Sequence, residues 1–460
     1  MPPSSSEPTI RSMVPTQPEF GNQGNLIISE VSSSQGDQPT VVWTRLPGQS
    51  CKIPNTRSIE LESGARGCSA LSFSADGRRL AVGVAGQTTS TIRVYDIPSG
   101  ILVIQLEQLY GLVYEISFHE DGLMTAAVGD GRVSVWNTDT WELIHKLDHP
   151  SYIYSAGFYP KNSDIIATAG FDRVVRLWKK EGRRGKDKTY SVVQELSGHN
   201  SHINCIVFDA EGHFLFSGDK QGTIKMWESL DNQNQIGFES STDSYARPNT
   251  FREWRYKREY KVEDQVCKLS LHPGGRRLLV HRLNPTSPLV MLDLRNGSFM
   301  QTYPDIQTFR VPAASCITPC GSWVIGGSNS GYSVVWNTDT GEKQHVYKDL
   351  PYTGPISAVQ YHPFDHFLVI GSSEPNSKVC LYTFDKKKDI INDEKSHEVG
   401  TPRVQDTPKY PFKQVAKIIL DGSAAREEMK TPVDLQDIVE KLNLALQQCR
   451  AKKEHSSDLE

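Results

Sequence analysis

The stretch IYSAGFYPKNSDIIATAGFDRVVRLWK, residues 153–179, contains three short apolar segments separated by two turns. The first segment ends in aromatic residues just before Pro160, and the third ends at Trp178. Short segments with alternating apolar residues are typical of β-strands, and polar turns between them are typical of hairpins. The stretch therefore predicts three consecutive antiparallel strands.

This three-strand pattern occurs seven times. The copies span residues 68–96, 113–137, 153–179, 203–228, 266–293, 314–337 and 356–383. The third strand of each copy carries one anchor residue: Tyr95, Trp136, Trp178, Trp227, Leu292, Trp336 and Tyr382. Successive anchors are 41, 42, 49, 65, 44 and 46 residues apart, which fits the WD-repeat period of about 40–45 residues with two insertions.

A fourth strand of each repeat is expected in the segment that connects one copy to the next. Candidates are 101–106, 142–147, 191–196 and 343–348. Because one four-stranded sheet cannot bury both of its faces alone, the seven sheets are expected to stack radially. We therefore predict an all-β fold, a seven-bladed WD-repeat β-propeller over residues 25–385. Either 25–31 or 40–45 is expected to supply the outer strand of the last blade and so close the ring.

The flanks of the predicted propeller have a different character. Residues 1–24, rich in Pro and Ser, predict a disordered tail. Residues 386–430 predict a polar linker, 431–454 an amphipathic, coiled-coil-like helix, and 455–460 a short tail. One face of this helix is apolar and would dock on the propeller or pair with another helix, including that of a second copy: Leu435, Ile438, Val439, Leu442 and Leu446.

The overall composition, 37% hydrophobic and 23% charged, fits a soluble globular protein. No apolar run reaches the roughly 18–20 residues that span a bilayer, and the start of the chain lacks the pattern of a signal peptide. A formal net charge of −4 argues against a nucleic-acid-binding protein. The eight cysteines include no C-x-x-C pair, so we expect a reduced cytoplasmic chain without a zinc site. Cys316 and Cys320 are expected to be half-buried residues of a strand and its turn.

Several His and Asp residues occupy positions that the repeat defines. The third copy has a complete set of side chains for a buried hydrogen-bonded network: His149, Thr168, Asp172 and Trp178. The second copy retains Asp130 and Trp136, and the fourth retains His199 and Trp227, with Gln221 at the position expected for the Asp. Because no nucleophile accompanies these His–Asp pairs, we expect them to stabilise the blades rather than to catalyse a reaction.

The sequence contains no phosphate-binding loop, nucleophile elbow or cluster of metal ligands. We therefore expect neither an enzyme nor a cofactor nor a small-molecule substrate. Propellers present the loops of two rims to proteins and peptides, and the rim near the start of each first strand would carry Tyr110, Tyr152, Tyr154 and His202. This set suits a peptide-binding hot spot, and ordinary packing between blades is the alternative.

Two basic stretches leave alternatives open. Residues 251–261 interleave five basic residues with aromatic ones, which suits an RNA or an acidic partner, although an outer blade strand with one wet face is favoured. Residues 179–188 carry six basic and two acidic residues, and a solvated loop is favoured there over a nuclear signal.

Seven phrases lie partly outside the general WD pattern and resemble the WD-repeat region of the jouberin family. They are RLPGQSCKIPN (45–55), ARGCSALSFS (65–74), YDIPSG (95–100), HPSYIYSAGFYP (149–160), FDAEGHFLFSGD (208–219), ITPCGSWVIGGS (317–328) and DLPYTGPISAVQYHPF (349–364). The resemblance runs from about Arg45 to Asp385, and the 431–454 helix resembles a helical stretch that follows the propeller in the family.

The resemblance implies a non-enzymatic scaffold that supports cilium assembly at the ciliary transition zone and basal body, associated with the centrosome and cytoskeleton. It implies nephrocystin-type and Meckel-type partners, and a link to a Rab small GTPase and β-catenin. Long family members also carry an N-terminal region with a coiled coil and a C-terminal Src-homology 3 domain. Only 44 residues precede the match, and nothing resembles an ALYDY-type strand. We therefore expect a shortened family member, a partial gene model or a lineage-specific form, and the resemblance leaves open whether partners of these modules are retained.

A WD-repeat adaptor of another complex is the alternative function. A substrate receptor for a ubiquitin ligase or a chromatin reader would also use a generic propeller, and the basic stretch 179–188 would suit the second of these.

Overall fold

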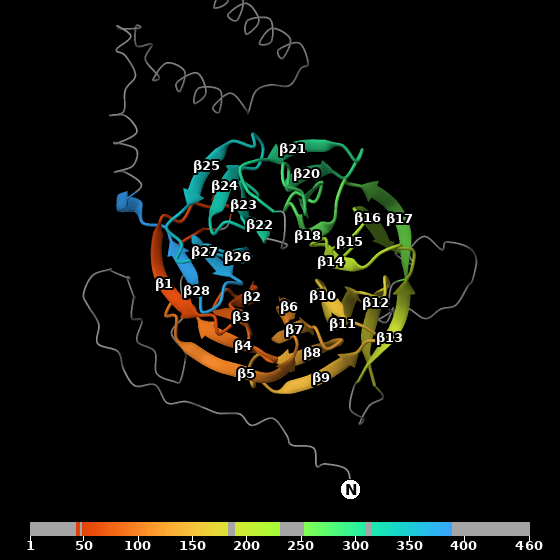
Figure 1. Cartoon of the computed structure of the whole chain (residues 1–460). Coiled ribbons are helices and arrows are strands. Elements are labelled where there is room, and N and C mark those ends of the chain that lie inside the picture. The colour runs from red at the N-terminus through yellow and green to blue at the C-terminus, as the bar shows by residue number, and fades with distance from the viewer. Residues whose placement is uncertain (1–42, 47, 183–188, 231–252, 309–313, 389–460) are drawn as a thin grey trace, which may run out of the picture. The chain divides into compact units, whose positions relative to one another are not determined.

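Seven four-stranded antiparallel sheets form a ring around a central channel (Figure 1). The computed structural model describes residues 43–46, 48–182, 189–230, 253–308 and 314–388. These residues belong to the first of two units of the chain, Met1–Asn392, and the second, Asp393–Glu460, lies outside the described residues. The seven sheets confirm the predicted seven-bladed propeller.

The first three blades follow one another along the chain. The first contains β2 (Cys68–Phe73), β3 (Arg79–Ala85), β4 (Thr89–Asp96) and β5 (Leu102–Tyr110). The second contains β6 (Val113–His119), β7 (Leu123–Val128), β8 (Arg132–Asn137) and β9 (Leu143–Asp148). The third contains β10 (Ile153–Tyr159), β11 (Asn162–Gly170), β12 (Val175–Glu181) and β13 (Thr189–Leu196).

The next three blades have the same strand order. The fourth contains β14 (Ile203–Phe208), β15 (Phe214–Asp219), β16 (Thr223–Ser229) and β17 (Trp254–Lys261). The fifth contains β18 (Val266–Leu271), β19 (Arg277–Arg282), β20 (Leu289–Asp293) and β21 (Phe299–Tyr303). The sixth contains β22 (Ser315–Ile317), β23 (Trp323–Gly327), β24 (Ser333–Asn337) and β25 (Lys343–Tyr347).

The seventh blade joins the two ends of the ring. It contains β26 (Ile356–Tyr361), β27 (Phe367–Ser372) and β28 (Lys378–Thr383), and its outer strand is β1 (Thr56–Glu62). The expectation that 25–31 or 40–45 closes the ring is therefore wrong. Residues 25–31 lie outside the described part, and the described residues 43–45 form no strand. The outward positions of β1 are polar, so its apolar pattern is weak.

The core lies between neighbouring blades. Inner strands are covered on both faces, and β7 is buried at all six positions. Outer strands have one wet face, and β13 is mostly exposed or half-buried. One apolar cluster, for example, joins Ala81 and Val94 of the first blade to Met124 of the second. Each blade is therefore stable only when both neighbours are present.

The residues just before β1, 43–46 and 48–55, form a segment that we call the strap. Three buried or half-buried side chains of the sixth and seventh blades donate hydrogen bonds to carbonyl oxygens of the strap. These are Trp323 Nε1 to Cys51 O (2.8 Å), Tyr361 Oη to Lys52 O (2.7 Å) and Tyr347 Oη to Pro54 O (2.5 Å). The strap is thereby fixed in place before the chain enters β1.

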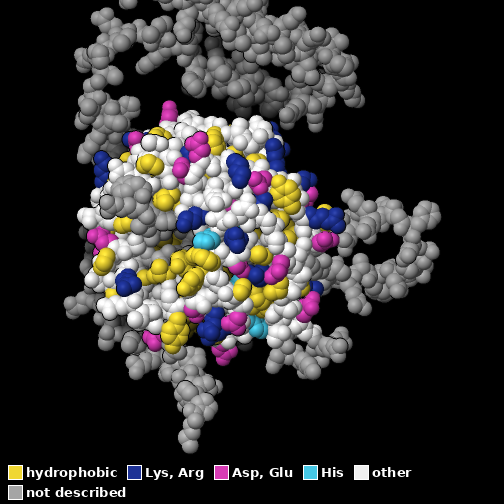
Figure 2. Space-filling view, turned by 45° about the vertical axis from the view of Figure 1, so that its right-hand side comes forward, with side chains coloured by type: hydrophobic (Ala, Val, Ile, Leu, Met, Phe, Trp, Pro, Cys, Tyr) yellow, Lys and Arg dark blue, Asp and Glu magenta, His cyan; other side chains and the backbone are white. Residues whose placement is uncertain are grey.

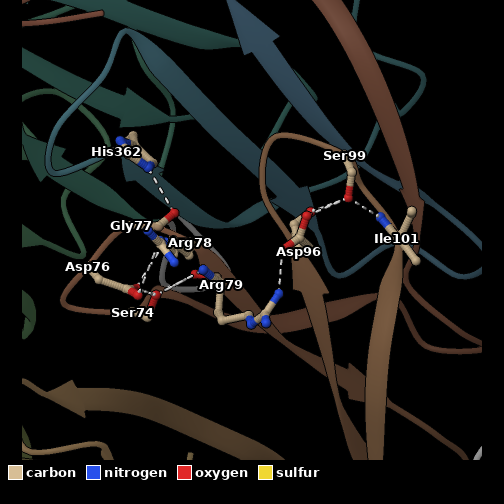
Figure 3. Close-up of polar contacts among 9 residues, drawn as sticks. All are labelled: Ser74, Asp76, Gly77, Arg78, Arg79, Asp96, Ser99, Ile101 and His362. Atoms are coloured by element: carbon tan, nitrogen blue, oxygen red, sulfur yellow. Dashed lines mark hydrogen bonds and ion pairs between the residues drawn. The ribbon is translucent and has the colours of Figure 1, made fainter. Parts of the chain in front are cut away.

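His362 joins the last blade to the first (Figure 3). It is fully buried, and its Nε2 lies 2.9 Å from Gly77 O in the turn between β2 and β3. Burial lowers the pKa of His362 to about 4, so the ring is neutral. Gly77 has φ of +76°, and a Cβ there would lie 2.5 Å from the imidazole, so this turn requires glycine. Trp43 of the strap packs on the same imidazole, with ring centroids 4.5 Å apart.

The closing strand generates a stability prediction. Leu61 is 3% exposed on β1 and packs in the core between the last and first blades. We expect Leu61→Ala to lower the free energy of unfolding by about 2–4 kcal/mol, because it leaves a cavity at the joint that holds the ring shut. Urea denaturation would measure this change. Glu60→Ala, at an exposed position of the same strand, is the control, and an equal effect of the two variants would contradict the role of Leu61.

Candidate functional site

The fourth blade contains the complete buried network of a WD repeat. His199 Nδ1 lies 2.8 Å from Asp219 Oδ2, and His199 Nε2 lies 2.7 Å from Ser217 Oγ. Trp227 Nε1 donates to the same Ser217 Oγ at 2.9 Å. Burial by itself would raise the pKa of Asp219, but hydrogen bonds from His199 and from two backbone N–H groups outweigh it and lower the pKa. Asp219 therefore supplies the carboxylate of this copy, although the repeat spacing places Gln221 at the position expected for it.

The third blade has a modified version of this network. Thr168 Oγ1 lies 2.8 Å from His149 Nε2 and accepts a hydrogen bond from Trp178 Nε1, also at 2.8 Å. Asp172 pairs with Arg176, whose guanidinium lies 3.4 Å from His149 Nδ1. Burial, and then the nearby Arg176, lower the pKa of His149 to about 4. Arg176 thus stands between the histidine and the aspartate that the sequence paired directly.

The second blade replaces the network with apolar contact. Asp130 accepts a hydrogen bond from the backbone N–H of Arg132 (3.1 Å) and pairs with the Arg132 side chain. No hydrogen bond between described residues joins Asp130 to Trp136. Leu109, at the histidine position, is buried in the same apolar cluster as Trp136. In this blade, apolar packing takes the place of the buried hydrogen-bonded network.

Aromatic side chains of the second, third and fourth blades meet on one rim of the ring. Tyr114 and Tyr154 pack edge to face with centroids 5.1 Å apart. Tyr152 packs against Phe171 (6.2 Å), and Phe171 lies over His202 (3.8 Å). Three of the four predicted rim residues therefore make aromatic contacts: Tyr152, Tyr154 and His202. Their partners, Tyr114 and Phe171, were not among the predicted residues.

This rim is unusually apolar for a surface exposed to water. Tyr110 is 60% and Tyr152 56% exposed, and the apolar neighbours Leu112, Tyr114 and Phe171 are each slightly above 40%. Figure 2 shows one face on which hydrophobic side chains gather beside a histidine and several Lys and Arg side chains. Exposed apolar side chains that lie together, with charged groups beside them, are a feature of protein-binding surfaces. We call the set Tyr110, Leu112, Tyr114, Tyr152, Tyr154, Phe171 and His202 the aromatic rim.

The aromatic rim borders the mouth of the central channel. A cavity of about 970 Å³ is lined by the innermost strands, and Tyr114, Tyr154 and His202 are among its lining residues. Inside it, Glu115 of β6 forms an ion pair with Lys268 of β18. Burial opposes the charge of Lys268, but Glu115 outweighs it and raises the pKa of the amine.

The same carboxylate also joins the blades between these two strands. Glu115 accepts hydrogen bonds from Ser155 Oγ and from the backbone N–H of Ala156 (3.2 Å). Ser155 Oγ in turn accepts from the backbone N–H of Ile206 (3.0 Å). Strands β6, β10, β14 and β18 are thus linked by one polar belt that stiffens the channel below the aromatic rim.

Two further cations line the cavity. Arg66 and Lys220 make no ion pair with any described residue, whereas Glu115, the acidic lining residue, is already paired. The mouth of the channel is therefore positively charged next to apolar surface. This arrangement fits a ligand that carries a carboxylate beside an apolar side chain.

Several predicted elements have a clear outcome. The stretch 251–261 contains the outer strand β17, which confirms the favoured interpretation. Three of its cations pair with acids, for example Lys257 with Glu228 at 2.9 Å. Cys316 lies in β22 and Cys320 in the turn that follows, both half-buried as expected. Three predicted features lie outside the described residues: most of the basic stretch 179–188, the N-terminal tail, and the helix 431–454 with its apolar face.

Comparison with known proteins agrees with this architecture. A model of the family "WD domain, G-beta repeat" matches residues 141–179 and 190–228. Jouberin from Rattus norvegicus and jouberin from Mus musculus are each 32% identical over 400 residues, which cover 83% of this chain. The chain belongs to the jouberin family. It spans 36% of the length of these two relatives.

More distant relatives share the repeat region. Autophagy-related protein 16 from Arabidopsis thaliana is 22% identical over 72% of this chain and 58% of its own length. The guanine nucleotide-binding protein subunit beta from Zea mays is 24% identical over 60% of this chain and 82% of its own. These two relatives match the chain only in part and at low identity, so the family membership rests on jouberin.

Two kinds of feature are absent from the described residues. No helix among them has the length and apolar character needed to cross a membrane. Within the same ranges, no three His, Cys, Asp or Glu side chains are grouped so that they could hold a metal ion.

The buried networks generate the second prediction. We expect His199→Ala to lower the free energy of unfolding by about 3–5 kcal/mol, because it leaves the Asp219 carboxylate buried without its partner. His149→Ala should cost only about 1–2 kcal/mol, since Asp172 keeps its partner Arg176. Chemical denaturation would measure both, with the exposed His213→Ala as the control. Equal losses at His199 and His149 would contradict the difference between the two networks.

Proposed function

We propose that this chain is a non-enzymatic scaffold of the ciliary transition zone and basal body that supports cilium assembly. The observation that carries the proposal is the 32% identity with jouberin over 83% of the chain. The absence of catalytic motifs in the sequence supports a scaffold rather than an enzyme. The proposed location is cytoplasmic, at the basal body and transition zone, with association to the centrosome and cytoskeleton.

We propose that the aromatic rim is the surface that holds partners. It combines exposed aromatic side chains with a stiff support, the polar belt at Glu115, so little side-chain freedom is lost when a peptide binds. The cations Arg66 and Lys220 at the channel mouth favour an acidic peptide with an apolar side chain next to its carboxylate. The family resemblance supports nephrocystin-type and Meckel-type proteins as partners, together with a Rab small GTPase and β-catenin. Self-association through the helix 431–454 remains a proposal.

A tagged chain expressed in ciliated cells tests the proposed location. We expect it to concentrate at the basal body and transition zone, and proximity labelling to recover transition-zone proteins, because the family resemblance implies a role there. A diffuse distribution would contradict the proposal. Recovery of cullin adaptors or histones instead would favour the alternative, a ubiquitin-ligase substrate receptor or a chromatin reader.

The aromatic rim can be tested separately from the location. We expect the double variant Tyr152→Ala/Phe171→Ala to reduce the recovery of proximity-labelled partners at least tenfold. The reason is that the two rings supply exposed contact surface. Tyr256→Ala, on the outer strand β17 and 55% exposed, is the matched control and should retain them. Thermal melting should show that both proteins are folded. Unchanged recovery with the double variant would exclude the aromatic rim while leaving the location intact.

A further inference from the structure

The turn between β22 and β23 surrounds the sulfur of Cys320 with hydrogen-bonding groups. Two backbone N–H groups point at Cys320 Sγ, that of Cys51 at 3.2 Å and that of Ser322 at 3.4 Å. Two hydroxyl groups also lie close, Ser322 Oγ at 3.3 Å and Thr318 Oγ1 at 3.4 Å. A neutral thiol is a weak acceptor, whereas a thiolate accepts several hydrogen bonds well. The surroundings of Cys320 therefore favour the ionised sulfur.

Cys51 is the second thiol at this place. It lies in the strap, is 1% exposed, and interacts with Cys320 through its side chain as well as its backbone. The hydrogen bond with the Cys51 thiol, together with those between Cys320 and the Ser322 and Thr318 side chains, outweighs burial and lowers the pKa of Cys320. The same hydrogen bond, together with burial, raises the pKa of Cys51. Within the pair, ionisation is thus favoured at Cys320 and the proton is favoured at Cys51.

The two cysteines are neighbours in the fold. The amide nitrogen of Cys51 is one bond from its Cα, so Cys320 Sγ lies within about 5 Å of Cys51 Cα. The two side chains also lie within hydrogen-bonding reach of each other. Cys320 is half-buried, whereas Cys51 is almost completely buried, so a small oxidant meets Cys320 first.

The other cysteines lack this environment. Cys68 and Cys205 are almost completely buried, and burial raises the pKa of Cys68 to about 12. Cys267 and Cys316 line the channel, and burial raises the pKa of each to about 12. Among the described cysteines, Cys320 is the one whose surroundings favour the thiolate.

We propose that Cys51 and Cys320 are a peroxide-sensitive thiol pair, and that their disulfide fastens the strap to the sixth blade. The Cys320 thiolate attacks one oxygen of hydrogen peroxide, the O–O bond breaks, and the leaving hydroxide takes a proton to become water. The resulting sulfenic acid is attacked by Cys51 sulfur, which loses its proton as hydroxide departs to form the second water. Two thiols and one peroxide thus give one disulfide and two waters.

The disulfide would act on the closure of the ring. Cys51 precedes the closing strand β1 by only a few residues, whereas Cys320 lies 269 residues further along the chain. A covalent bond across so long a loop restricts the unfolded chain strongly. The oxidised protein should therefore melt at a temperature about 5 °C higher than the reduced protein.

Peptide mapping of the whole chain tests the proposal. The reduced protein is exposed to hydrogen peroxide, blocked by alkylation and digested without reductant. We expect a linked pair of peptides that contain Cys51 and Cys320. Because one tryptic peptide, 311–343, contains both Cys316 and Cys320, variants must separate them. The link should persist in the control Cys316→Ser and be absent from Cys51→Ser and Cys320→Ser. In Cys51→Ser, the sulfenic acid of Cys320 should accumulate and be trapped by dimedone.

The wild-type chain provides a test that needs no variant. At pH 6, iodoacetamide should alkylate Cys320 at least tenfold faster than Cys267 or Cys316, because the thiolate is the reacting form. A link through Cys316, the absence of any link, or equal alkylation of these three cysteines would each overturn the proposal. A rise in melting temperature on oxidation that persists in Cys51→Ser would overturn the assigned effect on the strap.

Discussion

The pairing of β1 with β28 is the contact on which the rest of the ring depends. Each blade buries one face against each neighbour, so the first and last blades are stable only if they meet. The antiparallel pair between 56–62 and 378–383 brings them together across more than 300 residues of chain. Asn55 completes the joint, since it donates to Asp385 O (2.9 Å) and accepts from Asp385 N (2.8 Å). Closing so long a loop costs entropy, and only the packing of all seven blades offsets it.

Local patterns explain which parts of this fold could be predicted from the sequence. The inner three strands of each blade are covered on both faces, and their apolar pattern repeats at a nearly constant period. Outer strands carry a weaker pattern because one face is wet. Those near an evident repeat, such as β9 and β13, were predicted, while β1 was missed because its sequence, TRSIELE, alternates weakly. Its role depends on a partner at the other end of the chain, which no local pattern reveals.

The polar networks show a different limit. The third copy has Asp172 four residues after Thr168, and the same spacing applied to the fourth copy leads to Gln221. The structure uses Asp219, two residues after Ser217, because its carboxylate reaches His199 from the end of β15. In the third blade Arg176 fills the space between histidine and aspartate. The repeat thus predicts which residue types belong to the network, but it does not predict the direction in which each side chain points.

The aromatic rim was predicted in part for a similar reason. The start of each first strand follows from the repeat, which located Tyr152, Tyr154 and His202. Phe171 lies in the turn between β11 and β12 of the third blade, and the packing of the third blade against the fourth brings it over His202. The ion pair between Glu115 and Lys268 spans the channel between the second and fifth blades, so it exists only once the ring is closed. Contacts between blades that are distant in sequence therefore complete the surface.

The register of the closing pair also determines how the ring responds to mechanical force. Thr56, the first residue of β1, faces Thr383, the last residue of β28. The chain thus enters and leaves the ring at one end of the same strand pair. Tension applied between the two flanks would load the hydrogen bonds of this pair one after another, as in a zipper, rather than all together in shear. Because the strap is hydrogen-bonded to the sixth and seventh blades, a pull on the N-terminal side would load the strap before it reached this strand pair.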